Sequence, residues 1–387
     1  MTRILGSSSA EQSLGTFVFV WENLGPMHVD RCEAVAERFA GQRKVIGIEI
    51  GGASLTYSWA PTDAKGFRKV TLFPGSTKDI SRYWRFRALW NACVPYSGAD
   101  YFFCDYQTPE VFLTATALGL LGKRVYVMND AKFDDKPRSI WRELAKSVAY
   151  WPYRGALVSG KRTRDYLRFL RFTDSRIASG YDTLSVRRVR DLATAAPAPD
   201  GAHFETRHFT AIARFVQKKN ISTLLDGYAI YVHSVATPRA LHLCGSGELD
   251  AALREQVSKL KLQDHVVFRG FVQAGEIATT LANTLALILP SVEEQFGLVV
   301  IEAQAMGVPV IFTPACGARD QLLRSGVNGF LVEPDNPTGM AFFMKIIASD
   351  EALWRRLACG ALNASALGDV MHFVDSIEQL TATPGST

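Results

Sequence analysis

The fold of this chain is best predicted from one stretch, Pro290-Ser-Val-Glu-Glu-Gln-Phe-Gly-Leu-Val-Val-Ile-Glu-Ala-Gln-Ala-Met-Gly-Val-Pro-Val310. Residues 298–306 are apolar almost all round, which is typical of a short buried helix. The preceding run 284–289, Thr-Leu-Ala-Leu-Ile-Leu, predicts a parallel strand. Glu302 stands inside the apolar run, where a carboxylate must find a partner or shift its pKa. We therefore expect hydroxyls or cations opposite Glu302.

The polar loop between this strand and this helix has the position of a binding site. In α/β folds, ligands bind where loops leave the C-terminal ends of parallel strands. The loop contains Glu294, and seven residues separate it from Glu302. The first amides of the helix, near Phe296, Gly297 and Leu298, lack intrahelical partners and can hold a phosphate.

This pattern resembles the donor site of the family-four retaining glycosyltransferases, which are nucleotide-sugar enzymes of the GT-B superfamily. The likeness rests on the two spaced glutamates, on Phe296-Gly297, and on the Glu-Ala-x-Ala-x-Gly-x-Pro-Val run that begins at Glu302. Four further segments resemble the family's motifs in the expected order, namely 209–219, 241–248, 266–272 and 328–334. The resemblance is strong over residues 205–335 and weak in the first half.

The resemblance implies a role for each matching residue. Transfer from a nucleoside-diphosphate sugar places negative charge on the leaving diphosphate, which needs fixed donors nearby. Arg214 and Lys219 match the residues that supply them, Glu302 matches the acceptor of the ribose hydroxyls, and Glu294 holds sugar hydroxyls. We expect Glu294, Arg214 and Lys219 to be the catalytic residues. Other donor-binding positions are the amides of Phe296, Gly297 and Leu298, the turn glycines Gly245 and Gly247, the base-edge segment Gly270, Phe271 and Val272, and Asp320, where the family usually has a glutamate.

Each of these positions also has a purely structural interpretation. Lys218-Lys219 and Glu293-Glu294 could be ordinary solvated pairs, and Glu302 a buried structural carboxylate. The spacing to Glu302 and to Phe-Gly selects Glu294 over Glu293. Gly245-Ser-Gly247 lacks the third glycine of a dinucleotide fingerprint, so a plain turn explains it equally well.

The first half departs from the family pattern. The usual glycine-rich loop after the first strand is replaced by Leu24-Gly-Pro-Met-His28, in which Gly25 still allows close backbone approach to the donor. His28 is a candidate donor to phosphate or acceptor, with a structural histidine as the alternative. Where many relatives carry His-Asp, this chain has Asn129-Asp130. Asparagine cannot take a proton, which the front-face mechanism ascribed to the family tolerates. We place His28, Asn129 and Asp130 on the acceptor side.

Composition excludes several classes of function. The net charge of +5 supports no nucleic-acid partner by itself. The six cysteines show no paired spacing, which indicates reduced thiols, a cytoplasmic setting and no zinc site. The first residues lack an apolar core, so we expect no signal peptide, and no apolar run has the length of a membrane span. No Asp-x-Asp stands at a strand end, so we expect no metal and no cofactor beyond the nucleotide-sugar co-substrate.

The 387 residues suit two domains. Six apolar runs alternate with amphipathic stretches and predict a parallel sheet covered by helices on both faces; they are 17–21, 45–50, 69–73, 101–104, 124–128 and 155–159. The Pro-rich segment 194–201 interrupts this alternation, which resumes at Phe209. We predict an α/β fold, in which the resemblance implies the GT-B arrangement of two Rossmann-like domains facing across a cleft. The predicted parts are an acceptor-side domain 1–194, a linker 195–203, a nucleotide-sugar domain 204–365, and a helix and tail 366–387 that can cross back onto the first domain.

Two stretches, 82–90 and 162–172, mix arginines with aromatic residues. Such faces can rest on anionic lipid, so peripheral contact with the inner face of the cytoplasmic membrane is one hypothesis. The alternative is a pair of ordinary helices with one core face and one solvated face.

The sequence thus predicts a retaining, metal-independent glycosyltransferase that uses a nucleoside-diphosphate sugar, with a UDP-sugar as the expected donor, in cell-envelope glycan, lipopolysaccharide or exopolysaccharide synthesis. Its expected partners are the donor and a glycan or lipid-linked acceptor. The alternatives are transfer to a small soluble acceptor, a GT-B nucleotide-sugar epimerase, and a non-catalytic GT-B partner subunit. A nicotinamide oxidoreductase is disfavoured by the incomplete glycine fingerprint.

Overall fold

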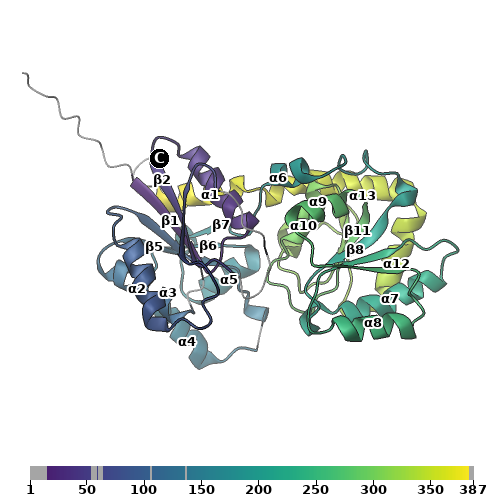
Figure 1. The fold of residues 1–387 in the computed structure, drawn as a ribbon, viewed down its shortest axis with the longest axis horizontal. Helices are drawn as coiled ribbons and strands as arrows, with labels where there is room; N and C mark the ends of the chain where they lie inside the picture. Colours follow the sequence, from purple (N-terminus) through teal and green to yellow (C-terminus); the bar gives the residue numbers. More distant parts are fainter. Residues whose placement is uncertain (1–14, 54–58, 60–63, 105–106, 136, 383–387) are drawn as a thin grey trace, which may run out of the picture.

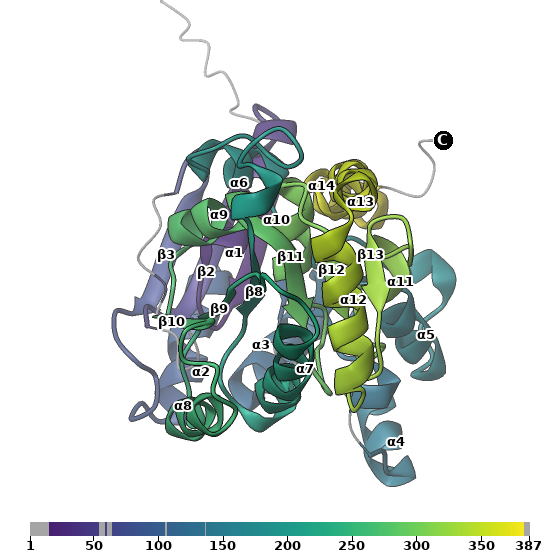
Figure 2. The same ribbon diagram turned by 90° about the vertical axis from the view of Figure 1, so that its right-hand side faces the viewer.

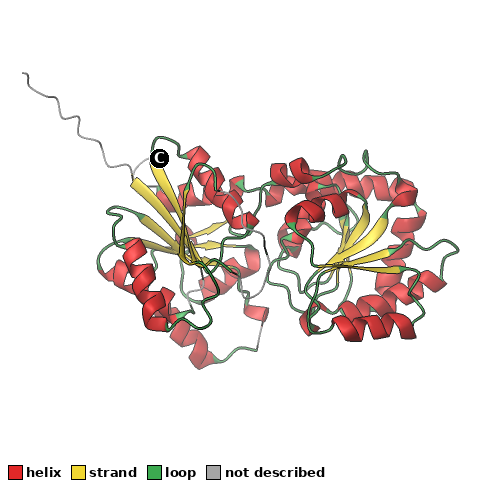
Figure 3. Cartoon of the chain, in the orientation of Figure 1, coloured by secondary structure: helices red, strands yellow, loops and turns green. Residues whose placement is uncertain are grey.

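A computed structural model of the chain describes residues 15–382, except 54–58, 60–63, 105–106 and 136. The chain forms two α/β units that lie side by side, each with a central sheet between helices (Figures 1 and 3). All strand pairings between the named strands are parallel. The α/β fold predicted from the sequence is confirmed.

The first sheet has seven strands in the order β3-β2-β1-β4-β5-β6-β7. They are β1 (Gly15–Trp21), β2 (Arg43–Gly51), β3 (Arg68–Phe73), β4 (Asp100–Phe103), β5 (Arg124–Asn129), β6 (Gly155–Val158) and β7 (Ile177–Ser179). The central strands are apolar on both faces because helices cover both. In β1, Phe17, Val18, Phe19 and Val20 are all fully buried.

The second sheet has six strands in the order β10-β9-β8-β11-β12-β13. They are β8 (His208–Ile212), β9 (Leu241–Cys244), β10 (Val266–Gly270), β11 (Thr284–Leu289), β12 (Val310–Phe312) and β13 (Gly329–Leu331). In each sheet the chain starts at an inner strand, runs to one edge, and returns to the other side of that strand. The order therefore reverses between β1 and β4 and between β8 and β11, and the crevice at such a reversal is where open α/β sheets bind ligands.

Helices cover both faces of both sheets (Figure 2). Those that follow strands of the first sheet are α1 (Pro26–Arg38), α2 (Arg82–Cys93), α3 (Pro109–Leu120), α4 (Ile140–Ala149), α5 (Lys161–Phe169) and α6 (Val186–Leu192). Those after β8 are α7 (Ile221–His233), α8 (Asp250–Lys259), α9 (Ala274–Ala282), α10 (Val299–Ala305), α11 (Arg319–Leu322), α12 (Pro337–Ser349), α13 (Glu351–Ala364) and α14 (Met371–Thr381). None of the helices in these described ranges is long and apolar enough to cross a bilayer.

Two helices, α6 and α14, pack across the boundary between the units. Helix α6 lies within the predicted first domain, yet Val186 and Val189 join the apolar cluster around Leu281 and Val300 of the second unit. The chain therefore changes packing partners before the predicted linker 195–203 is reached. The linker prediction rested on proline content, which marks where regular structure stops and not where packing partners change.

The C-terminal helix α14 packs in the opposite direction, onto the first unit. Phe373, Val374 and Ile377 share an apolar cluster with Phe19 of β1. The Ser376 hydroxyl donates to the carbonyl oxygen of Ser179 over 2.8 Å. Helix α14 therefore follows the second unit in sequence and packs on the first.

Candidate functional site

The loop after β11 is held in place by the loop after β12. Residues Glu294 and Cys316 form an isolated parallel β-bridge, and the Gly317 amide donates to the Glu294 carbonyl over 3.2 Å. The Ala318 amide likewise donates to the Phe296 carbonyl over 2.9 Å. Gly297, with a φ of 96°, takes a left-handed conformation that favours glycine. The backbone around Glu294 is thus fixed on two sides before α10 begins.

Two lysines after β8 meet the two glutamates after β11. The Lys219 ammonium forms an ion pair with the Glu294 carboxylate, to which the Ser291 hydroxyl also donates over 3.3 Å. Lys218 pairs with Glu293 over 2.8 Å. The side chains of Lys219 and Glu294 are only 11% and 14% exposed, so neither is an ordinary solvated surface charge. The structure brings these two predicted catalytic residues together at the reversal between β8 and β11.

Arg214 follows β8 in a loop that packs against the glycine turn after β9. The Phe215 amide donates to the Ser246 carbonyl over 2.8 Å. A Cβ at position 245 would lie 1.8 Å from the Ala213 carbonyl oxygen, and one at position 247 would lie 2.4 Å from that of Phe215. Close backbone packing therefore explains Gly245 and Gly247 without a ligand, and their effect on the site is to hold the backbone on either side of Arg214.

The segment expected at the base edge adjoins the same turn. Gly270 has a φ of 71°, and its carbonyl accepts from the Gly245 amide over 2.7 Å. Phe271 is 39% exposed, whereas Val272 is buried. An exposed ring at the carboxyl end of β10 is suitably placed to contact a planar base.

Glu302 lies on α10 and is partly buried. Desolvation is the main reason why the pKa of its carboxyl is raised to about 7. The Arg188 cation lowers this pKa, and the Asp30 carboxylate raises it further. Arg188, on α6, holds Asp30, on α1, by two hydrogen bonds of 2.6 and 2.8 Å. The expected cation opposite Glu302 is thus present, but it is shared with a carboxylate from the first unit.

The loop after β1 is packed internally. The His28 ring lies 4.8 Å from the Trp21 ring between centroids, and its Nδ1 accepts from the Gly25 amide over 3.0 Å. Burial, followed by the nearby Arg31 cation, lowers the pKa of His28 well below its ordinary value. The ring is therefore neutral, with its proton on Nε2. A Cβ on Gly25 would lie 2.5 Å from the Trp59 ring, so a larger residue there would have to displace that ring.

The other two acceptor-side candidates, Asn129 and Asp130, differ in burial and in hydrogen-bond partners. Asn129 is buried, its amide donates to the Tyr150 hydroxyl over 2.6 Å, and its carbonyl accepts from the Ala131 amide over 2.8 Å. Both ends of the side chain are therefore engaged in the interior, and the structure does not present Asn129 to an acceptor. Asp130 is partly exposed and faces Gln295 of the second unit over 3.5 Å.

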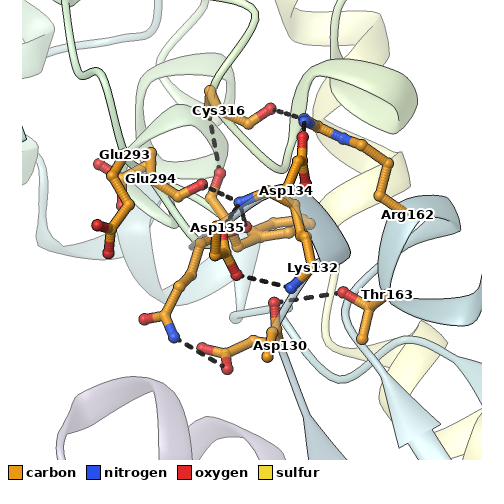
Figure 4. A network of polar contacts seen from close by, with 12 residues as sticks. Asp130, Lys132, Asp134, Asp135, Arg162, Thr163, Glu293, Glu294 and Cys316 are labelled. Atoms are coloured by element: carbon orange, nitrogen blue, oxygen red, sulfur yellow. Dashed lines mark hydrogen bonds and ion pairs between the residues drawn. The ribbon is translucent and has the colours of Figure 1, made fainter. Parts of the chain in front are cut away.

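Two cations of the first unit reach into the loops around Glu294 (Figure 4). Lys132 is buried and pairs with Asp135. Its ammonium donates to the carbonyl oxygens of Glu294, over 2.7 Å, and of Gln295, over 3.2 Å.

Arg162 joins the units next to Lys132. It pairs with Asp134 over 3.0 Å and with Asp320 over 2.9 Å, and it donates to the Cys316 carbonyl. Asp320 was expected near the donor sugar, and the structure gives it an ion-pair partner from the first unit. The side chain of Asp is one methylene shorter than the family's usual Glu, and here it meets the guanidinium.

Residues 201–361 match the family model described as glycosyl transferases group 1. The second unit is a group 1 glycosyltransferase domain. Alignments with curated relatives are partial and span between 22% and 43% of the relatives' own length. One of them, N-acetyl-alpha-D-glucosaminyl L-malate synthase of Bacillus anthracis, is 32% identical over 146 residues, which cover 38% of this chain and 37% of that protein.

Similarity to solved structures extends over both units. Sucrose-phosphate synthase from Thermosynechococcus elongatus has a TM-score of 0.69 at 18% identity, over 94% of this chain and 98% of that one. HepE of Anabaena, solved with UDP and glucose, has a TM-score of 0.70 at 16% identity over the same two shares. The fold is therefore GT-B, as expected from the sequence.

Several residues around the candidate site were not predicted from the sequence. Lys132 follows Asn129-Asp130 at the carboxyl end of β5, and this position at the sheet edge was the available signal. Asp30 and Arg188 were missed because Asp30 stands between His28 and Arg31 in a polar stretch of α1, so only the structure shows that it is buried. Within the described ranges, no cluster of three or more histidine, cysteine or carboxylate side chains is arranged to hold a metal ion.

Proposed function

We propose that the protein is a retaining, metal-independent glycosyltransferase that moves a sugar from a UDP-sugar to a hydroxyl acceptor. The observation that carries this proposal is the ion pair of Lys219 with Glu294 at the reversal between β8 and β11. A mostly buried cation beside a carboxylate suits a site that must bind a diphosphate and sugar hydroxyls at adjacent points. The group 1 family match of this domain supports the proposal.

Each donor contact follows from the position of a side chain. Lys219 and Arg214, both after β8, would bind the diphosphate, and the free amides of residues 296–298 would bind its sugar-side phosphate. Glu294 neutralises Lys219 in this structure, and a bound diphosphate would compete for that ammonium and leave the carboxylate for sugar hydroxyls. Glu302 would accept from the ribose hydroxyls. HepE, which shares the fold, was solved with UDP and glucose, which supports a UDP-sugar as the donor.

The proposed reaction needs no protein base. The bond between the anomeric carbon and the β-phosphate oxygen breaks, and the acceptor oxygen bonds to that carbon from the same face. The acceptor proton passes to the leaving phosphate, whose charge Arg214 and Lys219 stabilise. This route is compatible with the internal position of Asn129 and with the neutral ring of His28.

The first candidate acceptor is a glycan or lipid-linked saccharide of the cell envelope, used at the inner face of the cytoplasmic membrane. The second is a small soluble molecule, which the name of the malate synthase from Bacillus anthracis favours. In either case the acceptor would approach from the first unit, because the donor residues belong to the second.

The test is slow hydrolysis of the donor by the purified chain. A panel of UDP-, GDP-, ADP- and dTDP-sugars is incubated with the protein, and free nucleotide is measured over time. We expect release from one or more UDP-sugars and almost none with Arg214→Ala. No release from any donor, together with no calorimetric binding of UDP, would sink the proposal.

A further inference from the structure

Helix α4 exposes its apolar side chains to solvent. Ile140, Trp141, Leu144 and Val148 are 61%, 78%, 46% and 75% exposed, and Trp151, just after the helix, is 72% exposed. A surface helix of a soluble protein normally turns its apolar face to the core. Five large apolar side chains exposed on one short segment are unusual enough to mark an interaction surface.

The inner face of α4 is polar, so the helix is fixed in this inverted orientation. Glu143 is buried, and its carboxylate accepts from the Tyr166 hydroxyl over 2.5 Å and from Lys146 over 3.2 Å. Arg138 lies 3.6 Å from the same carboxylate. Turning the apolar face inward would break this network and leave a charge without its partners.

The exposed surface continues onto the end of α3. A Cβ on Gly119 would lie 3.2 Å from the Pro152 carbonyl oxygen, so the α3 terminus lies against the turn that follows Trp151. Leu120 and Leu121, which come next, are 68% and 63% exposed. Figures 1 and 2 both place α4 at the lower edge of the first unit, where it projects beyond its neighbours.

The charges of this surface are almost all positive. Residues 138–154 contain Arg138, Arg142, Lys146 and Arg154, and their one acid, Glu143, is buried. Arg142 and Arg154 are exposed, and they follow Trp141 by one residue and Trp151 by three residues along the chain. Tryptophan rings and arginine heads together suit the head-group layer of an anionic bilayer. A second copy of the chain would place like charges against each other and is disfavoured.

We propose that α4 and the end of α3 form a membrane-docking surface, which lies in the plane of a bilayer rich in anionic phospholipid. This surface differs from the stretch 162–172, for which the sequence also suggested contact with anionic lipid. There Arg162 joins the units and Arg164 donates to the Ile177 carbonyl over 2.7 Å. The proposal stands independently of the reaction, although it suits an acceptor with a lipid anchor. Helix α4 follows the loop that carries Lys132, so docking would bring the interdomain contact close to the bilayer.

The experiment is co-sedimentation of the full chain with vesicles of phosphatidylcholine, pure or with one third phosphatidylglycerol, at low and high salt. We expect binding to the anionic vesicles that weakens with salt. The variant Trp141→Ser/Val148→Ser/Trp151→Ser should partition about tenfold less or lower. The matched control Ile230→Ser/Val267→Ser/Phe342→Ser removes three exposed apolar residues from the second unit and should bind like wild type.

A second variant, Arg142→Gln/Arg154→Gln, leaves the apolar residues in place and should flatten the salt dependence. Thermal melts and UDP binding check that each variant is folded. The proposal is overturned if wild type stays in the supernatant, if the α4 variant binds normally, or if the control loses as much. It is also overturned if sedimentation velocity shows a wild-type dimer that the α4 variant converts to monomer, because the surface would then join two copies.

Discussion

The ammonium of Lys132, in the first unit, lies 2.7 Å from the carbonyl oxygen of Glu294, in the second. The same lysine donates to the next carbonyl, that of Gln295, and pairs with Asp135 of its own loop. It therefore holds the backbone of the loop that carries Glu294, whose carboxylate pairs with Lys219. We infer that Lys132 is a positioning residue, which fixes where the Glu294 carboxylate lies relative to the acceptor side.

Replacing Lys132 with methionine should lower turnover more than it lowers UDP affinity. The change leaves two carbonyl oxygens without their donor, and such losses at buried groups cost about 1–3 kcal/mol. We expect kcat for donor hydrolysis to fall roughly tenfold and the Kd for UDP to change by less than about threefold, since each tenfold corresponds to about 1.4 kcal/mol. Steady-state kinetics and calorimetry measure the two quantities.

Two variants serve as controls for Lys132→Met. Lys132→Arg keeps a cation and several donors, so it should recover part of the lost kcat. Lys259→Met removes a lysine that is largely exposed on α8 and should behave like wild type. If Lys132→Met lost UDP affinity and turnover equally, a general structural role would explain it and the positioning role would be wrong.

The glutamates after β11 offer a matched pair for a second prediction. Glu294→Gln should lower turnover by about 10²-fold, because it removes a charge-assisted contact worth roughly 2–4 kcal/mol. Glu293→Gln disturbs the more exposed pair with Lys218 and should remain close to wild type. Equal losses in the two variants would show that the spacing to Glu302 selected the wrong residue.

The donor contacts differ in the part of the nucleotide that they bind, which gives the third prediction. Arg214→Ala and Lys219→Ala should weaken UDP binding by about tenfold or more while leaving uridine binding nearly unchanged, since both cations are assigned to phosphates. Lys218→Ala, one residue away, is the control. Calorimetry that showed the same loss for UDP and uridine would contradict the assignment.

The sequence predicted contacts that lie within one unit better than contacts between the units. Lys219 and Glu294 follow neighbouring strands of one parallel sheet, and the family resemblance had assigned both to one donor site. The Arg162 partner of Asp320 was not predicted, and Lys132 was missed, for the opposite reason. Their partners lie across the boundary, and no periodicity encodes how two domains face each other. The sequence left open whether Gly245 and Gly247 serve the donor or a plain turn, because close backbone packing becomes visible only in three dimensions.

The fourth prediction concerns metal ions. Basic side chains and helix-terminal amides take the place of a divalent cation in the proposed site. Activity should therefore survive an excess of EDTA at wild-type rate. Activity that EDTA abolishes and magnesium or manganese restores would require a metal site that the proposal lacks.

The fifth prediction concerns the pH dependence of nucleoside binding through Glu302. Its carboxyl has a pKa raised from 4.5 to about 7, chiefly by desolvation. Above pH 7 the ionised carboxylate accepts from the ribose hydroxyls, and below pH 7 the free protein carries a proton there that binding must displace. Affinity should therefore be highest above about pH 7 and fall as the pH is lowered, by up to about tenfold between pH 8 and pH 6.

Uridine is the appropriate probe for this effect because it has the ribose but no phosphate that titrates in the same range. Calorimetry with wild type should show the loss of affinity at the lower pH. Glu302→Gln should bind uridine more weakly at pH 8 and show an almost flat profile, because the group that takes up the proton is gone. Asp30 and Arg188 face the same carboxyl, so Asp30→Asn should move the midpoint of the wild-type profile to lower pH by removing a neighbouring negative charge. A wild-type affinity that does not change with pH, or an unchanged slope in Glu302→Gln, would remove Glu302 from the ribose site.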